Sequence, residues 1–167
     1  MDIHDNWHEV KNVFRESFKS SFHCAIATVG ENGEPHVTPI GSLILGRPGF
    51  GFYFEKFPKN LPRNLGTNSR VCVLAVNSAR WFWLKSLIGG RFSNPPAVRL
   101  HRVAGELRKA TEHETKLWQK RTMRVSFSKG HALMWRDMSM VREIQFTRVE
   151  PVHLGEMTHG LWYGHTW

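Results

Sequence analysis

The feature that most constrains the fold is the stretch from residue 51 to residue 77, GFYFEKFPKNLPRNLGTNSRVCVLAVN. It begins with one apolar run and ends with another, and short apolar runs bounded by turn-forming residues are typical of β-strands. The segment between them carries Leu61 and Leu65 four residues apart. This spacing predicts a short helix that packs on the sheet through the two leucines.

This strand–helix–strand unit predicts an anion site. Asn60 is expected to cap the helix, because asparagine is a favoured cap and Pro62 is tolerated in the first turn. The unpaired amides and the positive dipole end of such a helix attract phosphate, and Lys56, Lys59 and Arg63 add positive charge. We interpret the unit as a site for the phosphate of a bound cofactor.

The distribution of charge supports this interpretation. The net charge is +9, yet no Asp or Glu occurs between residues 56 and 105. The basic residues outside this stretch balance the 14 acidic residues of the chain. Basic residues within it therefore account for the whole excess, and they favour an anionic ligand over a merely solvated face. They are Lys56, Lys59, Arg63, Arg70, Arg80, Lys85, Arg91, Arg99 and Arg102.

The rest of the chain predicts a mainly β single domain, residues 1–167, with flanking helices. An amphipathic helix is expected over residues 4–20, and Asn32-Gly33 predicts a hairpin turn. Pro39 cannot donate to a ladder, so its strand should lie at an edge or a bulge, with backbone available to a flat ligand. Thr111 and Glu114 form a capping box that opens a helix to about Met123. Strands are expected over residues 22–29, 36–45, 50–55, 71–76, 97–109 and 141–149.

Three segments remain outside this scheme. Residues 80–96 form an apolar insertion with Trp81, Trp83 and Leu87, too apolar for a loop in water. It is interpreted as core packing, an inserted helix over the barrel, a lid or a subunit contact. Residues 152–167 form a C-terminal tail, and residues 129–139 are expected to be a loop or helical turn holding Trp135.

Several classes of protein are disfavoured. No apolar run approaches the ~20 residues needed to span a bilayer, and the N-terminus lacks a signal-peptide pattern, so a cytoplasmic protein without a membrane partner is expected. Cys24 and Cys72 lie in apolar runs and are expected to pack as small hydrophobes. His4 and His8 have metal-like spacing but no third ligand nearby, so no metal site is expected. Motifs for nucleotide-phosphate loops and nucleophile elbows are absent, and no catalytic residue is identified. A cofactor is therefore expected to carry any chemistry.

The chain resembles a known family in the order of its pieces. The Asn-Gly hairpin, the strand with P-H-V-T-P, the strand GFYFEK and the block R-N-L-G-T-N-S-R-V-C-V-L-A-V are similar to the pyridoxamine 5′-phosphate oxidase-like, FMN-binding split-barrel group. The resemblance covers residues 36–77, and more weakly 98–108 and 141–151.

The resemblance implies a six-stranded antiparallel split barrel that forms a homodimer, with FMN in a groove between the subunits. It implies that the strand at Thr38, Pro39, Ile40 and Gly41 lies along the flavin ring. It also implies that residues at the end of the next strand and in the turn after it approach the phosphate. These residues are Phe54, Glu55, Lys56, Lys59, Asn60, Arg63 and Asn64. The pyridoxamine oxidases of the group carry Arg and Lys on the strand that matches residues 38–45, and this chain has neither there. Pyridoxamine phosphate is therefore not the expected substrate.

Three functions follow from these observations. The first is an FMN-dependent oxidoreductase that acts on a small molecule. The second is a non-catalytic module on the same barrel that holds haem or another flavin-like ligand. The third is nucleic-acid binding through the basic middle of the chain. It is disfavoured, because many aromatic residues there alternate with aliphatic ones as core residues do.

Overall fold

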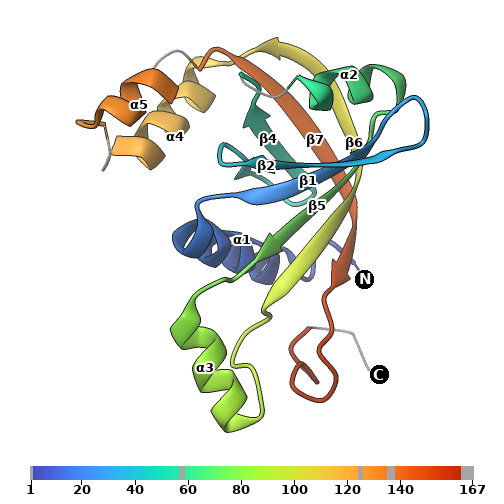
Figure 1. The fold of residues 1–167 in the computed structure, drawn as a ribbon, viewed down its shortest axis with the longest axis vertical. Helices are drawn as coiled ribbons and strands as arrows, with labels where there is room; N and C mark the ends of the chain where they lie inside the picture. The colour runs from blue at the N-terminus through green and yellow to red at the C-terminus, as the bar shows by residue number, and fades with distance from the viewer. Residues whose placement is uncertain (1, 57–58, 124–125, 135–137, 163–167) are drawn as a thin grey trace.

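The computed structural model describes residues 2–56, 59–123, 126–134 and 138–162. These residues form one strongly curved antiparallel sheet of seven strands in the order β2-β1-β5-β6-β7-β4-β3, with helices around it (Figure 1). The strands are β1 (Cys24–Val29), β2 (Pro35–Ile40), β3 (Ile44–Leu45), β4 (Phe50–Phe54), β5 (Arg70–Val76), β6 (Ala97–Lys109) and β7 (Met140–Pro151). The expected mainly β class is confirmed.

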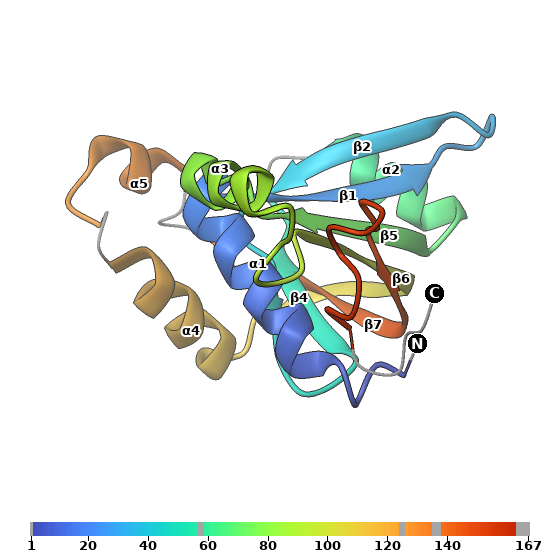
Figure 2. The same cartoon turned by 90° about the horizontal axis from the view of Figure 1, so that it is seen from below.

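The helices lie around this sheet. They are α1 (Trp7–Ser21), α2 (Asn60–Thr67), α3 (Arg80–Gly89), α4 (Glu112–Thr122) and α5 (Lys129–Met134). Helix α1 crosses the sheet (Figure 2) and buries Trp7, Val10 and Phe14 against the side of β1, β5 and β6. Helix α4 packs on β4 through Trp118 and Phe54, whose ring centroids are 5.6 Å apart. The α4 contact forms a second, smaller core beside the main one.

Alternating burial explains why the predicted strands form where they do. In β5, Val71, Val73 and Ala75 are buried, whereas the residues between them are only half-buried. The hairpin between β1 and β2 also follows the prediction at Gly33, whose φ of 82° lies in the region that glycine adopts easily. Apolar runs bounded by turn-forming residues therefore placed the central strands correctly.

Other predictions need correction. Helix α1 begins at Trp7, and β1 begins at Cys24, because Phe22 adopts a left-handed conformation (φ 63°) that ends α1. The expected strand over residues 36–45 is divided into β2 and β3 by a break at residues 41–43. Residues 80–89 form a regular helix. Residues 129–134 do form a short helix, but Trp135 lies outside the described residues.

Candidate functional site

Ser42 joins the end of β2 to the end of β4. Its hydroxyl donates to the carbonyl oxygen of Phe54 at 2.9 Å and accepts from the backbone N–H of Phe54 at 3.1 Å. Ser42 is buried, so water does not compete for these bonds. The two strand ends that the sequence assigned to one site therefore lie side by side. Ser42 itself is not among the predicted site residues.

Glu55, at the end of β4, is held by Arg142 of β7. The Arg142 guanidinium donates to both carboxylate oxygens, with Nε–Oε2 at 3.0 Å and Nη2–Oε1 at 2.9 Å, and Tyr53 donates its hydroxyl to Oε2 at 2.6 Å. Arg142 also donates to the carbonyl oxygen of Gly105 at 2.8 Å. The hydrogen bonds that Arg142 donates to Glu55 raise the pKa of Arg142. Burial raises the pKa of the Tyr53 hydroxyl above its usual range. Glu55 is thus neutralised within the protein.

The first turn of helix α2 and the residues just before it carry the exposed members of the predicted phosphate-binding group. The N-cap of α2 is Lys59, without a side-chain capping bond, so the prediction that Asn60 caps the helix is wrong: Asn60 is its first residue. Lys56, Lys59, Asn60 and Arg63 are all exposed. Because α2 packs against β1 and β2, this basic turn lies next to the β2 edge.

Asn64 faces the interior. Its amide nitrogen donates to the hydroxyl of Thr28 in β1 at 3.1 Å, and both residues are buried. Gly30, which directly follows β1, packs close to Asn64. A Cβ added at Gly30 would lie only 3.6 Å from Asn64 Oδ1 and 3.5 Å from His36 Nε2. Asn64 therefore fastens α2 to the β1–β2 hairpin, and Thr28 is a partner that the sequence did not indicate.

The structure thus separates the predicted site residues into two groups. Phe54 is 2% exposed, with its ring against Trp118 and its backbone N–H on Ser42, so it is engaged within the protein like Glu55 and Asn64. The other residues surround the exposed turn or lie on strand β2, which is at the edge of the sheet as Pro39 predicted. This second group consists of Thr38, Pro39, Gly41, Lys56, Lys59, Asn60 and Arg63, whereas Ile40 is 4% exposed and belongs to the main core.

The basic stretch of the sequence is not one surface in space. Lys59 and Arg63 belong to α2, which precedes β5, whereas Arg80 and Lys85 belong to α3, which follows β5 (Figure 1). Arg99, in β6, is paired with Glu150 at 2.8 Å. The anion site therefore draws on the α2 group alone, and the α3 group is separate.

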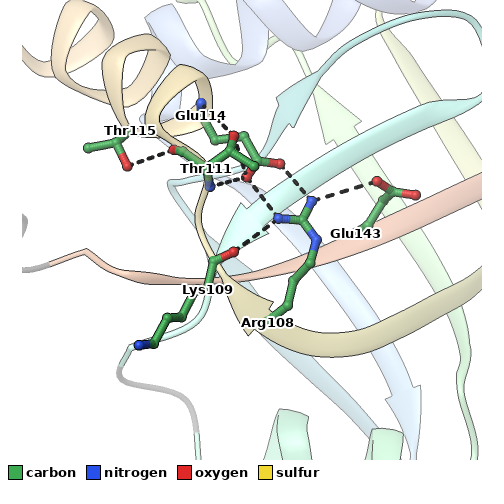
Figure 3. Close-up of polar contacts among 6 residues, drawn as sticks. All are labelled: Arg108, Lys109, Thr111, Glu114, Thr115 and Glu143. Atoms are coloured by element: carbon green, nitrogen blue, oxygen red, sulfur yellow. Dashed lines mark hydrogen bonds and ion pairs between the residues drawn. The ribbon is translucent and has the colours of Figure 1, made fainter.

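A polar cluster at the start of α4 has a structural role (Figure 3). Arg108 donates to both carboxylate oxygens of Glu114, at 2.9 and 2.7 Å, and Glu114 also accepts from the backbone N–H of Thr111 at 2.8 Å. The predicted capping box is confirmed. The Arg108 guanidinium, more than the Thr111 bonds, lowers the pKa of Glu114 to about 2. This cluster fixes α4 to the end of β6.

A cysteine, a histidine and a glutamate meet on the outer face of β5, β6 and β7. His101 Nε2 lies 4.0 Å from Cys72 Sγ and 3.0 Å from Glu150 Oε2. A nucleophilic pair held by an acid needs both ring nitrogens, one for each partner. Here a single nitrogen faces both, and burial raises the pKa of the Cys72 thiol, so the geometry does not activate Cys72.

Two kinds of feature are absent from the described residues: a cluster of metal ligands and a membrane-spanning helix. No group of three or more His, Cys, Asp or Glu side chains among them is placed to hold a metal ion. No helix in that part of the chain has the length and apolar content needed to cross a membrane.

Comparison with known proteins gives one family and one fold. The profile of the family described as pyridoxamine 5′-phosphate oxidase matches residues 10–153. A search of functionally curated proteins found no significant match. The sequence resemblance and the split-barrel class are both confirmed, although the sheet has seven strands where six were expected, since the two-residue β3 adds one.

Three solved structures illustrate the shared fold. An FMN-binding protein from Syntrophomonas wolfei subsp. wolfei is 10% identical with a TM-score of 0.59, covering 89% of this chain and 93% of its own. HupZ from Group A Streptococcus is 15% identical with a TM-score of 0.56, covering 85% and 92%. HutZ, the haem storage protein of Vibrio cholerae, is 16% identical with a TM-score of 0.54, covering 90% and 95%. At these identities the likeness shows the fold alone.

Proposed function

The chain belongs to the pyridoxamine 5′-phosphate oxidase family, and from that premise we propose that it is an FMN-binding oxidoreductase that acts on a small molecule. FMN, when bound, accepts a hydride or electrons and passes them on. The protein contributes a cradle for the phosphate, a backbone edge for the ring and a dry environment. The following features of the described residues support each part of the proposal.

The observation that carries the proposal is the pairing of Glu55 with Arg142. Glu55 is the one carboxylate among the predicted site residues, and its side chain is 5% exposed in a bidentate ion pair. With that charge neutralised, Lys59 and Arg63 present positive charge at the start of α2. A helix N-terminus flanked by exposed cations suits a phosphate dianion. The residues therefore fit the phosphate of FMN.

The edge of β2 provides the second element. Among the described residues, Thr38, Pro39 and Ile40 have a neighbouring strand on one side of their backbone only, because β2 is the first strand of the sheet. Such an edge can donate and accept hydrogen bonds along a flat heterocycle. Ser42 holds this edge against β4, so ring and phosphate positions are fixed relative to each other.

A second subunit completes the proposed site. Residues that are directly opposite in neighbouring strands share a face of the sheet, which places Pro39 and Val37 of β2 beside Ala25 and Ala27 of β1 and, beyond them, Leu74 of β5. Val37 is 68% exposed, and the alanines and Leu74 are only half-buried. An exposed apolar face of this kind suits a homodimer contact.

The absorption spectrum of freshly purified protein tests the proposal. We expect the two visible bands of an oxidised flavin, and release of FMN on denaturation. Protein purified without ligand should retain the same bands when it is mixed with FMN and then separated from unbound FMN by gel filtration. A Soret band after haem addition, with no uptake of FMN, would replace the proposal by the haem-binding alternative. Anaerobic mixing of reduced holoprotein with a panel of small electron acceptors tests the oxidoreductase part separately.

A further inference from the structure

Helix α3 carries apolar side chains on two faces, and only one of them is packed. On the inner face, the Phe92 ring lies 5.4 Å from that of Phe82 and 5.1 Å from that of Trp83, centroid to centroid. The indole of Trp83 donates to the carbonyl oxygen of Asn77 at 2.6 Å. These contacts hold α3 firmly against the body of the protein.

The outer face of α3 is exposed to solvent. Trp81 is 65% exposed, Leu84 45%, Leu87 63% and Ile88 80%. Figure 1 shows α3 projecting beyond the ends of β5 and β6. An exposed stripe of four large apolar side chains on one helix is unusual for a surface in water and marks an interaction site.

The charge around this stripe indicates what covers it. Arg80, Lys85 and Arg91 are exposed on and just after α3, and no acidic residue occurs in the sequence from 57 to 105. The Lys85 ammonium lies 5.7 Å from the ring centroid of Trp81. Glu9 and Glu16 line a pocket of about 230 Å³ together with Ala79 and Phe82, and so belong to the packed side. The outer face thus combines apolar side chains with three basic residues, none of which takes part in the ion pairs found among the described residues.

We propose that α3 docks the protein on an anionic phospholipid bilayer. Trp81, Leu84, Leu87 and Ile88 enter the boundary between headgroups and acyl chains, and the three basic residues contact the phosphates around them. A tryptophan and aliphatic residues beside lysine and arginine are the composition of helices that lie in a membrane interface.

The length of α3 determines how it binds. Its 10 residues extend about 15 Å, roughly half of the hydrocarbon thickness of a bilayer. It therefore lies on the surface and does not span it. The expectation of no membrane partner rested on the length needed to span a bilayer, which a surface helix does not need to reach.

Two other partners fit the same face less well. In a symmetric dimer whose twofold axis passes through this patch, the patch meets its own copy, which would bring Arg80, Lys85 and Arg91 of both copies together with no acidic residue on the helix to compensate them. A nucleic acid would use the positive charge and could stack on Trp81, but it offers nothing to Leu87 and Ile88. An anionic bilayer satisfies both the apolar and the basic residues.

Vesicle co-sedimentation tests this proposal. The full-length protein is mixed with phosphatidylcholine vesicles that contain phosphatidylglycerol, and in parallel with pure phosphatidylcholine vesicles. We expect binding to the anionic vesicles that weakens as salt is added. Fluorescence of Trp81, obtained as the difference between wild type and Trp81→Phe, should shift to the blue on binding.

Two variants separate the apolar and the electrostatic contributions. Leu87→Ser with Ile88→Ser should weaken partitioning at least about tenfold. Lys85→Gln with Arg91→Gln should weaken it about fivefold for each charge removed, at low salt. Matched controls lie away from α3: Leu107→Ser is near the far end of β6, and Lys109→Gln with Lys120→Gln removes two charges there and on α4. The controls should bind like wild type.

The remaining outcomes overturn the proposal. Absence of binding to anionic vesicles, or binding that both α3 variants leave unchanged, contradicts it directly. If the wild type without vesicles self-associates and Leu87→Ser with Ile88→Ser separates the copies, a second copy covers the face instead. If duplex DNA binds more tightly than vesicles and the α3 variants weaken it, the partner is a nucleic acid. All substituted side chains on α3 are exposed, so the variants should fold.

Discussion

Arg142 and Glu55 form a bidentate ion pair that connects β7 to the end of β4. Tyr53, which lies directly opposite Arg142 in the ladder, closes the network with its own bond to Glu55. The pair removes the negative charge nearest in sequence to Lys56, and it joins the two strands at the candidate site.

Removing the guanidinium should leave a buried carboxylate without its partner. We expect Arg142→Met to lower the free energy of unfolding by about 3–5 kcal/mol in urea denaturation. The double variant Arg142→Met with Glu55→Gln should recover part of this loss, because no uncompensated charge remains. An Arg142→Met protein as stable as wild type would show that the pair contributes nothing to the fold.

Glu114 should make stability depend on acid pH. Its pKa is lowered from 4.5 to about 2 by Arg108, so its ionised form stabilises the folded protein above pH ~4.5, and this contribution disappears as the pH falls towards 2. Since Arg108 is partly exposed, we expect Glu114→Gln to cost about 2 kcal/mol at neutral pH and to flatten the pH dependence across that window.

Glu112→Gln is the matched control for that experiment. Glu112 lies in the same first turn of α4 but is 82% exposed and contacts only Lys116 among the described pairs. It should change the acid limb of the stability curve little. An equal effect of both variants would mean that the Arg108 bonds are not responsible.

The sequence could predict elements whose signals are local. The apolar run at residues 71–76 identified β5, and the spacing of Thr111 and Glu114 identified the start of α4. The pairing of Glu55 with Arg142 could not be predicted, because it joins residues far apart in the chain and depends on the register of β4 and β7. A single sequence does not show that register.

The candidate site was predicted only in part for the same reason. The family resemblance implied that Asn64 approaches the phosphate. Its partner Thr28 is on a distant strand, and only the packing of α2 on β1 brings them together. Lys59 replaces Asn60 as the N-cap because packing of Leu61 and Leu65 fixes where the helix begins, and this overrides the capping preference.

Asn64 and Thr28 should therefore behave as a structural pair. Asn64→Ala and Thr28→Ala are each expected to lower the free energy of unfolding by about 1–3 kcal/mol, because each leaves a buried polar group without its bond. In the double variant the losses should be non-additive by about 1 kcal/mol. Additive losses in thermal or urea unfolding would show that the bond does not form.

Val37 should be necessary for the proposed homodimer. It is exposed on the outer face of β2, beside half-buried alanines of β1. We expect Val37→Glu to convert a dimer into a monomer in light scattering, with unchanged circular dichroism, because a charge would be buried in an apolar contact. A wild-type protein that is monomeric at micromolar concentration would contradict the dimer, and Glu34→Gln, in the preceding turn, serves as the control.

The central claim is that the start of α2 holds the phosphate of a flavin nucleotide. Titration with FMN and with riboflavin, followed by quenching of flavin fluorescence, tests it most directly because the two ligands differ only in the phosphate. We expect wild type to bind FMN at least about tenfold more tightly, as two charge-assisted contacts would give. Lys59→Ala with Arg63→Ala should abolish that preference, whereas Arg80→Ala with Lys85→Ala should keep it. Equal affinity of wild type for both ligands, or a preference that survives loss of Lys59 and Arg63, would contradict the account.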